Sequence, residues 1–192
     1  MKSLRSGVLF LVLGLIAAAV DAQAPTRVRG TIGGFDGKLL SVKSRDGKDV
    51  AIELAEKTII VFTQPIPLSE IKPGDFLGVT SMKRGDGTLT AYEVRRFPKP
   101  LNPGHRPFDG RDDQTMTNAT VGAMVQSASG RELTMTYKGG SQKITVPESA
   151  SISALVPGNR SQLVAGAPVN LTARAGDGGR LTAIRIQVSP PK

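Results

Sequence analysis

The sequence contains an internal repeat of two copies, and this repeat limits the possible folds more than any other feature. The segments Thr88–Ala91 and Arg180–Ala183 share the residues Leu-Thr-Ala at an offset of 92 residues. The same offset aligns five further pairs, which are Gly30 with Gly122, Ile52 with Ile144, Ser69 with Ser161, Gly74 with Gly166, and Val79 with Leu171. Agreement at this many positions indicates two copies of one structural unit. We therefore expect two homologous units, over residues 27–97 and 119–188.

Each unit has the alternation of apolar and polar residues that is typical of half-buried β-strands. Val50, Ile52 and Leu54, for example, are separated by single, less apolar residues. The same period occurs in segments 28–32, 40–42, 76–82 and 89–97. In the last strand of each unit the apolar phase shifts at the same place, at Tyr92 and at Ile184. A phase shift that occurs in both copies predicts a β-bulge, which lets a strand bend around a closing barrel.

A short helical turn is predicted between the third and fourth strands of each unit. Ser69 and Ser161 are candidate N-caps, and Gly74 and Gly166 follow as termination signals. Three strands, a helical turn and two strands in about 70 residues is the order of the OB-fold, a small Greek-key barrel. The predicted fold class is all-β, with two tandem small five-stranded OB-like barrels, each with its helical turn. A five-stranded meander or an SH3-like barrel is the alternative.

The first 22 residues have the order of a secretory signal peptide. Lys2 and Arg5 precede an uncharged apolar run, Val8–Val20, and small residues favour cleavage after Ala22. The run is shorter than the roughly 20 residues of a membrane-spanning helix, although an uncleaved N-terminal anchor is the alternative. No second apolar run approaches membrane length. We expect a periplasmic or secreted protein with no membrane span after cleavage.

The composition excludes several kinds of chemistry. There is no cysteine and one histidine, so disulfides, thiolate zinc sites, iron–sulfur clusters, thiol nucleophiles and multi-histidine metal centres are excluded. The sequence has neither a nucleophile elbow nor a phosphate-binding glycine loop followed by a helix. We expect a protein that is not an enzyme, with no catalytic residues, no metal site and no cofactor.

Residues 98–118, between the units, are predicted to be a Pro-rich linker. The chain's potential metal ligands gather only here, and they are His105, Asp109, Asp112 and Asp113. Their spacing matches no defined cation-binding loop, so a solvated linker is the expected state and divalent-metal handling is an alternative. The interpretation that we prefer for this segment docks Phe108 on a barrel and pairs Arg106 with a nearby acid.

The positive charge is spread over the chain. The formal charge is +9, of which +8 would stay after cleavage, with +3 in the first unit and +4 in the second. Only 4% of residues are aromatic, whereas OB-folds that hold single-stranded nucleic acid combine a basic groove with aromatic stacking platforms. The sequence therefore argues against nucleic acid as a partner and indicates a general preference for anionic ones.

The predicted ligand-binding residues are Phe35, Lys43, Lys83 and Arg84. In an OB-like barrel, ligands use the second and third strands and the loops that join strands one and two and strands four and five. These four residues fall on those segments of the first unit, and Phe35 stands out as an aromatic on a glycine-rich tip. The matching tip of the second unit, residues 126–130, has no aromatic. Phe35 folding back over the barrel mouth is the alternative.

Two groups of motifs resemble those of a known group of proteins. The segments Leu68–Asp75 and Thr88–Ala91 resemble an uncharacterised domain with an OB-like barrel in exported bacterial proteins, and His105–Asp109 and Thr115–Val121 resemble small tandem members of that group. Some members carry an automatic description as metal ABC transporter permeases. A permease needs several membrane-spanning helices, and the sequence after residue 22 predicts none. The resemblance implies export and an OB-like fold, and it implies no catalytic residue.

The function that we expect is that of an exported, non-enzymatic binding module of the bacterial cell envelope. It would contact a polar or anionic ligand, such as an anionic polymer, a glycan or an envelope protein, through the loops of the first barrel. A structural or assembly protein whose barrels pack on a partner is one alternative. An accessory protein that handles divalent metal through the linker is another.

Overall fold

The computed structural model describes residues 24–127 and 130–191, and the fold is all-β, as expected. The expected signal peptide, residues 1–22, lies outside the described residues. The strands are β1 Thr26–Phe35, β2 Leu39–Ser44, β3 Asp49–Pro65, β4 Phe76–Lys83, β5 Leu89–Phe97, β6 Gly104–Phe108, β7 Arg111–Ser127, β8 Gly130–Tyr137, β9 Gly140–Val146, β10 Ser151–Pro157, β11 Pro168–Ala175 and β12 Leu181–Val188. Three single-turn 3-10 helices are η1 Leu68–Glu70, η2 Arg160–Gln162 and η3 Asp177–Gly179. Within the described ranges, no helix is long and apolar enough to cross a membrane.

Five strands form a closed barrel, which we call ring 1. The strand order is β1–β2–β3–β12–β11, and β11 pairs back with β1. All pairs in the ring are antiparallel except β3 with β12. Side chains from all five strands fill the interior, among them the fully buried Leu40, Ile52 and Ile186. Leu163, which follows η2, packs against the same core.

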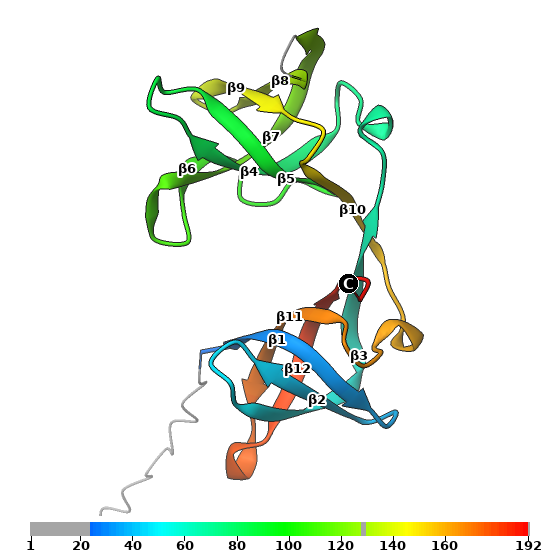
Figure 1. Cartoon of the computed structure of the whole chain (residues 1–192). Coiled ribbons are helices and arrows are strands. Elements are labelled where there is room, and N and C mark those ends of the chain that lie inside the picture. Colours follow the sequence, from blue (N-terminus) through cyan, green and yellow to red (C-terminus); the bar gives the residue numbers. More distant parts are fainter. Residues whose placement is uncertain (1–23, 128–129, 192) are drawn as a thin grey trace, which may run out of the picture.

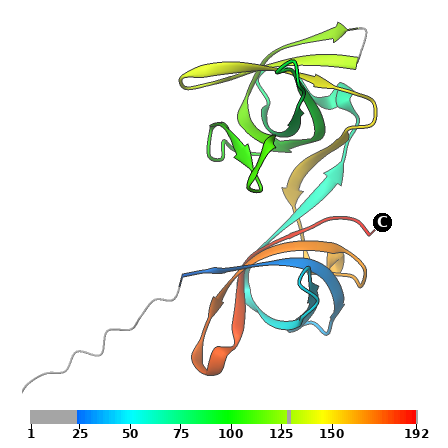
Figure 2. The ribbon, with the colours of Figure 1, turned by 60° about the vertical axis from the view of Figure 1, so that its left-hand side comes forward.

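A second set of strands, which we call ring 2, pairs in the same order. It runs β7–β8–β9–β5–β4, and β4 pairs back with β7. The pair β5–β9 is parallel, in the position of the parallel pair of ring 1. Leu77, Leu133 and Ile144 are fully buried in this core, and Ile71, which follows η1, packs against it as Leu163 does in ring 1. The two rings lie one above the other in Figure 1, and Figure 2 shows both from another side.

Neither ring is built from one sequence unit, so the expected barrels over residues 27–97 and 119–188 are wrong. Ring 1 combines β1–β3 of the first unit with β11 and β12 of the second, and ring 2 takes β4 and β5 from the first. The exchange goes with the length of β3, whose run of β-branched and aromatic residues, Thr58–Thr63, stays extended and carries the chain out of ring 1. The end of β3 then pairs antiparallel with β10, with Thr63 opposite Leu155. These two strands run side by side between the rings (Figure 1).

Most of the segment 98–118, which we expected to be a linker, forms a β-hairpin from Gly104 onward, so this prediction is also wrong. Strand β6 pairs antiparallel with the first half of β7, and Phe108 lies opposite Arg111. Asp109 and Gly110 between them have φ of 56° and 72°, which are the positive values of a type I′ two-residue turn. Pro107 is compatible with this strand because β6 is an edge strand. The hairpin adds β6 to β7 outside the closed path of ring 2, and ring 1 has no counterpart among the described residues.

Other local predictions have mixed outcomes. The β-bulges are confirmed, because the register shifts between Thr80 and Ser81 in ring 2 and at the matching place in ring 1 leave Tyr92 and Ile184 as the extra residues. The helical turns are found at the expected offset, but Ser69 and Ser161 lie inside them rather than at their N-caps. Those caps are Pro67, without a side-chain bond, and Asn159, which forms a capping box with Gln162.

Candidate functional site between the two rings

The structure does not bring the four predicted ligand-binding residues together. Phe35 and Lys43 belong to ring 1, whereas Lys83 and Arg84 lie at the end of β4 and in the turn after it, in ring 2. Phe35 is half-buried and packs against the ring 1 core, which matches the alternative in which it folds back. The common surface that we expected is therefore wrong, because the exchange of strands moves the β4–β5 turn to the other ring. Whether these residues contact a ligand stays a prediction.

The potential metal ligands of segment 98–118 do not converge. His105 Nδ1 lies 2.8 Å from Thr117 Oγ1, and both carboxylate oxygens of Asp113 accept bonds from Arg111, at 2.9 and 2.7 Å. Asp109 faces Arg29 of ring 1 at 3.6 Å. In residues 24–127 and 130–191, no three His, Cys, Asp or Glu side chains are placed to hold one ion.

Phe108 and Arg106 follow the preferred interpretation only in part. Phe108 is half-buried at the tip of the hairpin, but Arg106 is exposed and donates to the Asn102 carbonyl at 3.2 Å, and it forms no ion pair with an acid of the described chain. The acid beside Phe108, Asp109, makes the ion pair that reaches the other ring. The hairpin tip therefore connects ring 2 with ring 1.

A cleft of about 430 Å³ lies where the hairpin tip reaches ring 1, and we call it the inter-ring cleft. Ring 1, the β2–β3 turn and the chain after β12 contribute Arg29, Gly30, Arg45, Pro168, Val169, Asn170, Gln187 and Ser189 to its lining. Strand β5 and the hairpin contribute Tyr92, Glu93, Arg95, Phe108, Asp109 and Gln114. The lining thus depends on both rings and on both sequence units.

Three guanidinium groups from separate elements line this cleft. Arg29 is on β1 with a side chain 34% exposed, and Arg95 is on β5 with a side chain 23% exposed. Arg45 is exposed in the turn after β2, and its backbone N–H donates to the Arg29 carbonyl at 2.9 Å. That bond places Arg45 next to Arg29.

Two carboxylates offset part of this charge. Glu93 pairs with Arg95, and Asp109 pairs with Arg29 at 3.6 Å. Arg45 makes no ion pair with any residue in the described ranges. The buried Nε of Arg95 makes no hydrogen bond to a described residue. The cleft therefore has a net positive charge, and the Arg95 guanidinium has one buried N–H, at Nε, for which the described residues supply no acceptor.

Neutral donors add to the three guanidinium groups. Tyr92, the extra residue of the β5 bulge, donates from its hydroxyl to Gln114 Oε1 at 3.3 Å. Burial raises the pKa of the Tyr92 phenol, and the nearby Glu93 carboxylate raises it further, so the hydroxyl stays protonated at neutral pH. Across the cleft the Gln187 amide donates to Thr63 Oγ1 at 3.3 Å. These neutral groups donate to other side chains, so it is the three guanidinium groups that suit this lining to carboxylate, phosphate or sulfate groups.

Sequence reasoning missed the cleft residues because they come together only across the interface between the rings. Arg95 was visible as half of the basic pair Arg95-Arg96, and its counterpart at the repeat offset is Gln187. Both of these residues line the cleft, so the repeat itself was the signal that could have connected them. Searches with this chain find no matching protein-family model, no matching curated protein and no matching solved structure.

Proposed function

We propose that the protein is an exported, non-enzymatic binding module of the bacterial cell envelope, and that it holds an anionic group in the inter-ring cleft. One observation carries the proposal: Arg29, Arg45 and Arg95 come from different elements of two rings and line one cleft. Guanidinium groups bind carboxylate and phosphate oxygens through paired, charge-assisted hydrogen bonds. The ligand is thus assigned to the cleft rather than to the loops of the first expected barrel.

The sequence supplies the remaining parts of the proposal. Export rests on the signal-like order of residues 1–22, and the absence of cysteine fits an exported protein that depends on its hydrophobic cores. An anionic ligand agrees with the overall charge of +9. The resemblance to exported bacterial proteins with OB-like domains points to the same compartment.

We propose further that both rings are OB-like barrels. In each ring the strands follow the order first, second, third, fifth and fourth, and the third and fifth are parallel. In each ring a helical turn lies before the fourth strand. A five-stranded Greek-key barrel with these features is the arrangement of an OB-fold. The two barrels are then not each formed by consecutive residues, because they exchange their last two strands.

Binding of inorganic pyrophosphate, measured by titration calorimetry, tests the cleft. The variant Arg95→Gln removes one guanidinium and leaves Glu93 without its partner, and glutamine is the residue at the matching position of ring 1. We expect pyrophosphate affinity to fall about tenfold, because a hydrogen bond to a charged group contributes about 1.5–3 kcal/mol.

The matched control is Arg174→Gln, which removes the same charge from an exposed position near the end of β11, outside the cleft lining. It should leave the affinity within about twofold of the wild-type value. Equal losses in both variants would show that pyrophosphate responds to overall charge, and the cleft would then not be the site. Undetectable binding of pyrophosphate, citrate and sulfate to the wild-type protein would also contradict the proposal.

A further inference from the structure

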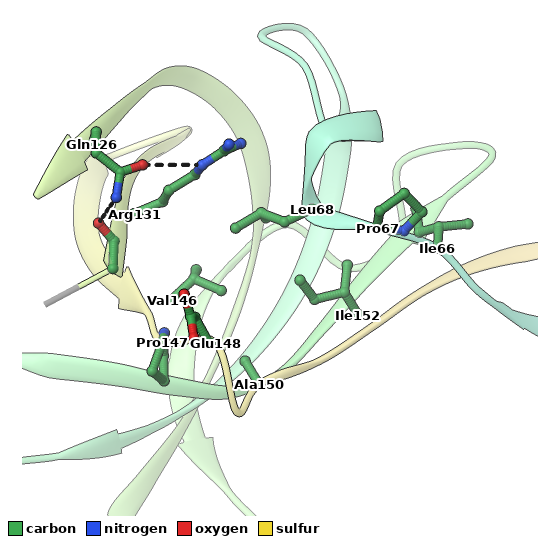
Figure 3. A pocket seen from close by; sticks show the side chains of 11 residues that line it. Ile66, Pro67, Leu68, Gln126, Arg131, Val146, Pro147, Glu148, Ala150 and Ile152 are labelled. Atoms are coloured by element: carbon green, nitrogen blue, oxygen red, sulfur yellow. Dashed lines mark hydrogen bonds between the residues drawn. The ribbon is translucent and has the colours of Figure 1, made fainter.

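The mouth of ring 2 next to η1 is a cavity of about 460 Å³. Figure 3 shows the apolar side chains of Leu68 and Ile152 on one side, and Arg131 with Gln126 on the other. Pro147 and Glu148, which follow β9, form another part of the lining. This cavity is distinct from the inter-ring cleft, with which it shares no lining residue.

The corresponding mouth of ring 1 is occupied by an arginine of the chain itself. Arg160, at the start of η2, donates from its guanidinium to the Gly37 carbonyl at 2.9 Å and to the Ala55 carbonyl at 3.2 Å. These two carbonyls come from the β1–β2 loop and from β3. The arginine therefore connects the helical turn to two separate segments of the barrel.

The repeat identifies the matching positions in ring 2. Leu68 takes the place of Arg160, and Pro147 takes the place of Ala55, both at the offset of 92 residues. Gly130 corresponds to Gly37, because Leu40 of β2 and Leu133 of β8 occupy matching register positions opposite Ile52 and Ile144. All three ring 2 residues line the cavity. The positions that surround a guanidinium in ring 1 thus surround an open space in ring 2.

The charged neighbours of the two mouths match as well. Glu148 corresponds to Glu56, and Arg131 corresponds to Lys38. A positive side chain at this position is therefore compatible with a bound guanidinium, as ring 1 demonstrates. In ring 2 the Arg131 Nε donates to Gln126 Oε1 at 3.3 Å, whereas Glu148 is exposed and forms no ion pair with a described residue. Ring 2 thus has the setting for a guanidinium, but its own sequence supplies leucine there.

We propose that the mouth of ring 2 binds an arginine side chain presented by another polypeptide. The guanidinium pairs with the Glu148 carboxylate and donates to the second lone pair of the Pro147 carbonyl, which also accepts from the Ala150 N–H at 3.0 Å. The methylene groups of the incoming side chain pack against Leu68 and Ile152, because a long cationic side chain buries its stem on apolar surface. The partner is a protein segment with an exposed arginine, recognised independently of any anion in the cleft.

N-acetyl-L-arginine amide is the probe that tests this proposal, and backbone amide shifts in NMR spectra are the readout. We expect millimolar probe to shift signals at the ring 2 mouth and to leave those of the ring 1 mouth unchanged. N-acetyl-L-citrulline amide has the same shape without the charge, so it should bind at least fivefold more weakly. No shift with the arginine probe, or equal shifts with both, would overturn the proposal.

Two reciprocal variants exchange the residue types at the matching positions of the two mouths. Leu68→Arg supplies the missing guanidinium from the chain itself and should abolish probe binding, whereas Arg160→Leu empties the ring 1 mouth and should create a second site there. Glu148→Gln changes no volume, so it tests the ion pair even if Leu68→Arg disturbs folding, and it should weaken binding at least fivefold. Unchanged affinity in Glu148→Gln, or full binding in a folded Leu68→Arg variant, would contradict the assignment. Pyrophosphate binding in the cleft is the control and should be the same in all three variants.

Discussion

Ring 1 and ring 2 share a backbone plan and differ in what occupies their surfaces. Strand order, the position of the parallel pair, the bulge and the helical turn agree between them. The rings differ at the mouth, which Arg160 closes in ring 1 and which is an open cavity in ring 2. They differ also at the β6–β7 hairpin, which among the described residues belongs to ring 2 alone. A repeat of this kind provides an internal control, because a side chain that differs within an unchanged backbone identifies where the two copies have separate roles.

The exchange of strands couples the folding of the two rings. Each hydrophobic core contains residues of both sequence units, since Leu40 and Ile186 meet in ring 1 and Leu77 and Leu133 meet in ring 2. In this structure neither unit forms a five-stranded barrel by itself. The comparison between the rings therefore predicts that they fold together, although their surfaces act separately.

The largest expected effect concerns this exchange. A protease site inserted between the exposed residues Lys99 and Pro100 allows the folded chain to be cut between the units. We expect the two fragments to stay together as a one-to-one complex and to separate only in denaturant, because each fragment supplies strands to both rings. Size-exclusion chromatography with light scattering measures this, with the uncut insertion variant as the control. Two folded fragments that elute separately would contradict the exchange and support barrels built from consecutive residues.

Core truncations give the next largest effect. Leu40 and Leu133 occupy matching positions in the two rings, and both are fully buried. Leu40→Ala and Leu133→Ala should each lower the free energy of unfolding by about 2–5 kcal/mol, from lost burial and the cavity left behind. Because each sequence unit supplies strands to both rings, urea denaturation should show one transition that both variants shift.

Leu39→Ala is the control for these truncations, since Leu39 is 41% exposed and its loss should cost about 0.5 kcal/mol or less. Two separate transitions, each moved by only one of the core variants, would show that the rings unfold independently.

The mouths differ by a smaller amount of stability. Arg160→Leu removes two hydrogen bonds from an exposed guanidinium, and we expect a loss of about 1 kcal/mol in the free energy of unfolding, because solvent screens part of such contacts. Leu68→Arg should cost less, since the new guanidinium can pair with the Glu148 carboxylate, although the Pro147 and Gly130 carbonyls already accept from Ala150 and Gln126. Paired urea titrations of both variants measure the asymmetry. Equal losses in the two variants would show that the mouths do not differ in the way that we infer.

Local features of each ring were accessible from the sequence. The period of two along Val50–Leu54, the bulge residues Tyr92 and Ile184, and the Asp46-Gly47 turn, in which Gly47 has φ of 83°, depend on residues close together in the chain. Side-chain alternation and turn chemistry determine such features within a few residues. The all-β class and the internal repeat follow from the same signals.

The exchange of strands could not be predicted, for a physical reason. The two units present equivalent strand edges, so β4 could pair with β1 of its own unit or with β7 of the other, and the residue pattern favours neither. The choice depends on whether the chain after Leu54 turns back or stays extended. Here the β-branched and aromatic residues of Thr58–Thr63 stay extended, and the end of β3 pairs with β10 of the other unit. Domain swapping exploits this equivalence of edges. The same ambiguity led us to assign Lys83 to a surface shared with Phe35.

The cleft was inaccessible for a related reason. Arg29 and Arg95 are 66 positions apart in the chain, on strands that belong to different rings. Their common cleft depends on the angle at which β3 and β10 hold the rings, and no local periodicity encodes that angle. The hairpin tip adds a second dependence, since Asp109 pairs with Arg29 only because segment 98–118 is a hairpin.

The smallest predicted effect concerns the hairpin, where ring 2 differs most from ring 1. It carries His105, the single histidine of the chain, whose pKa lies below the ordinary 6.5 because of burial and, to a lesser degree, the charge of Lys83. The unfolded chain therefore binds a proton more readily than the folded chain, so this residue lowers stability as the pH falls below about 6.5. The carboxylates of Asp36 and Asp86 have pKa values lowered from 3.8, so they titrate at lower pH than His105.

Thermal unfolding between about pH 7.5 and pH 5 should show a larger decrease in Tm for the wild-type protein than for His105→Gln. Parallel pH profiles for the two proteins would mean that the hairpin leaves His105 in the same environment as in the unfolded chain, and the hairpin would then not distinguish the rings in their response to pH.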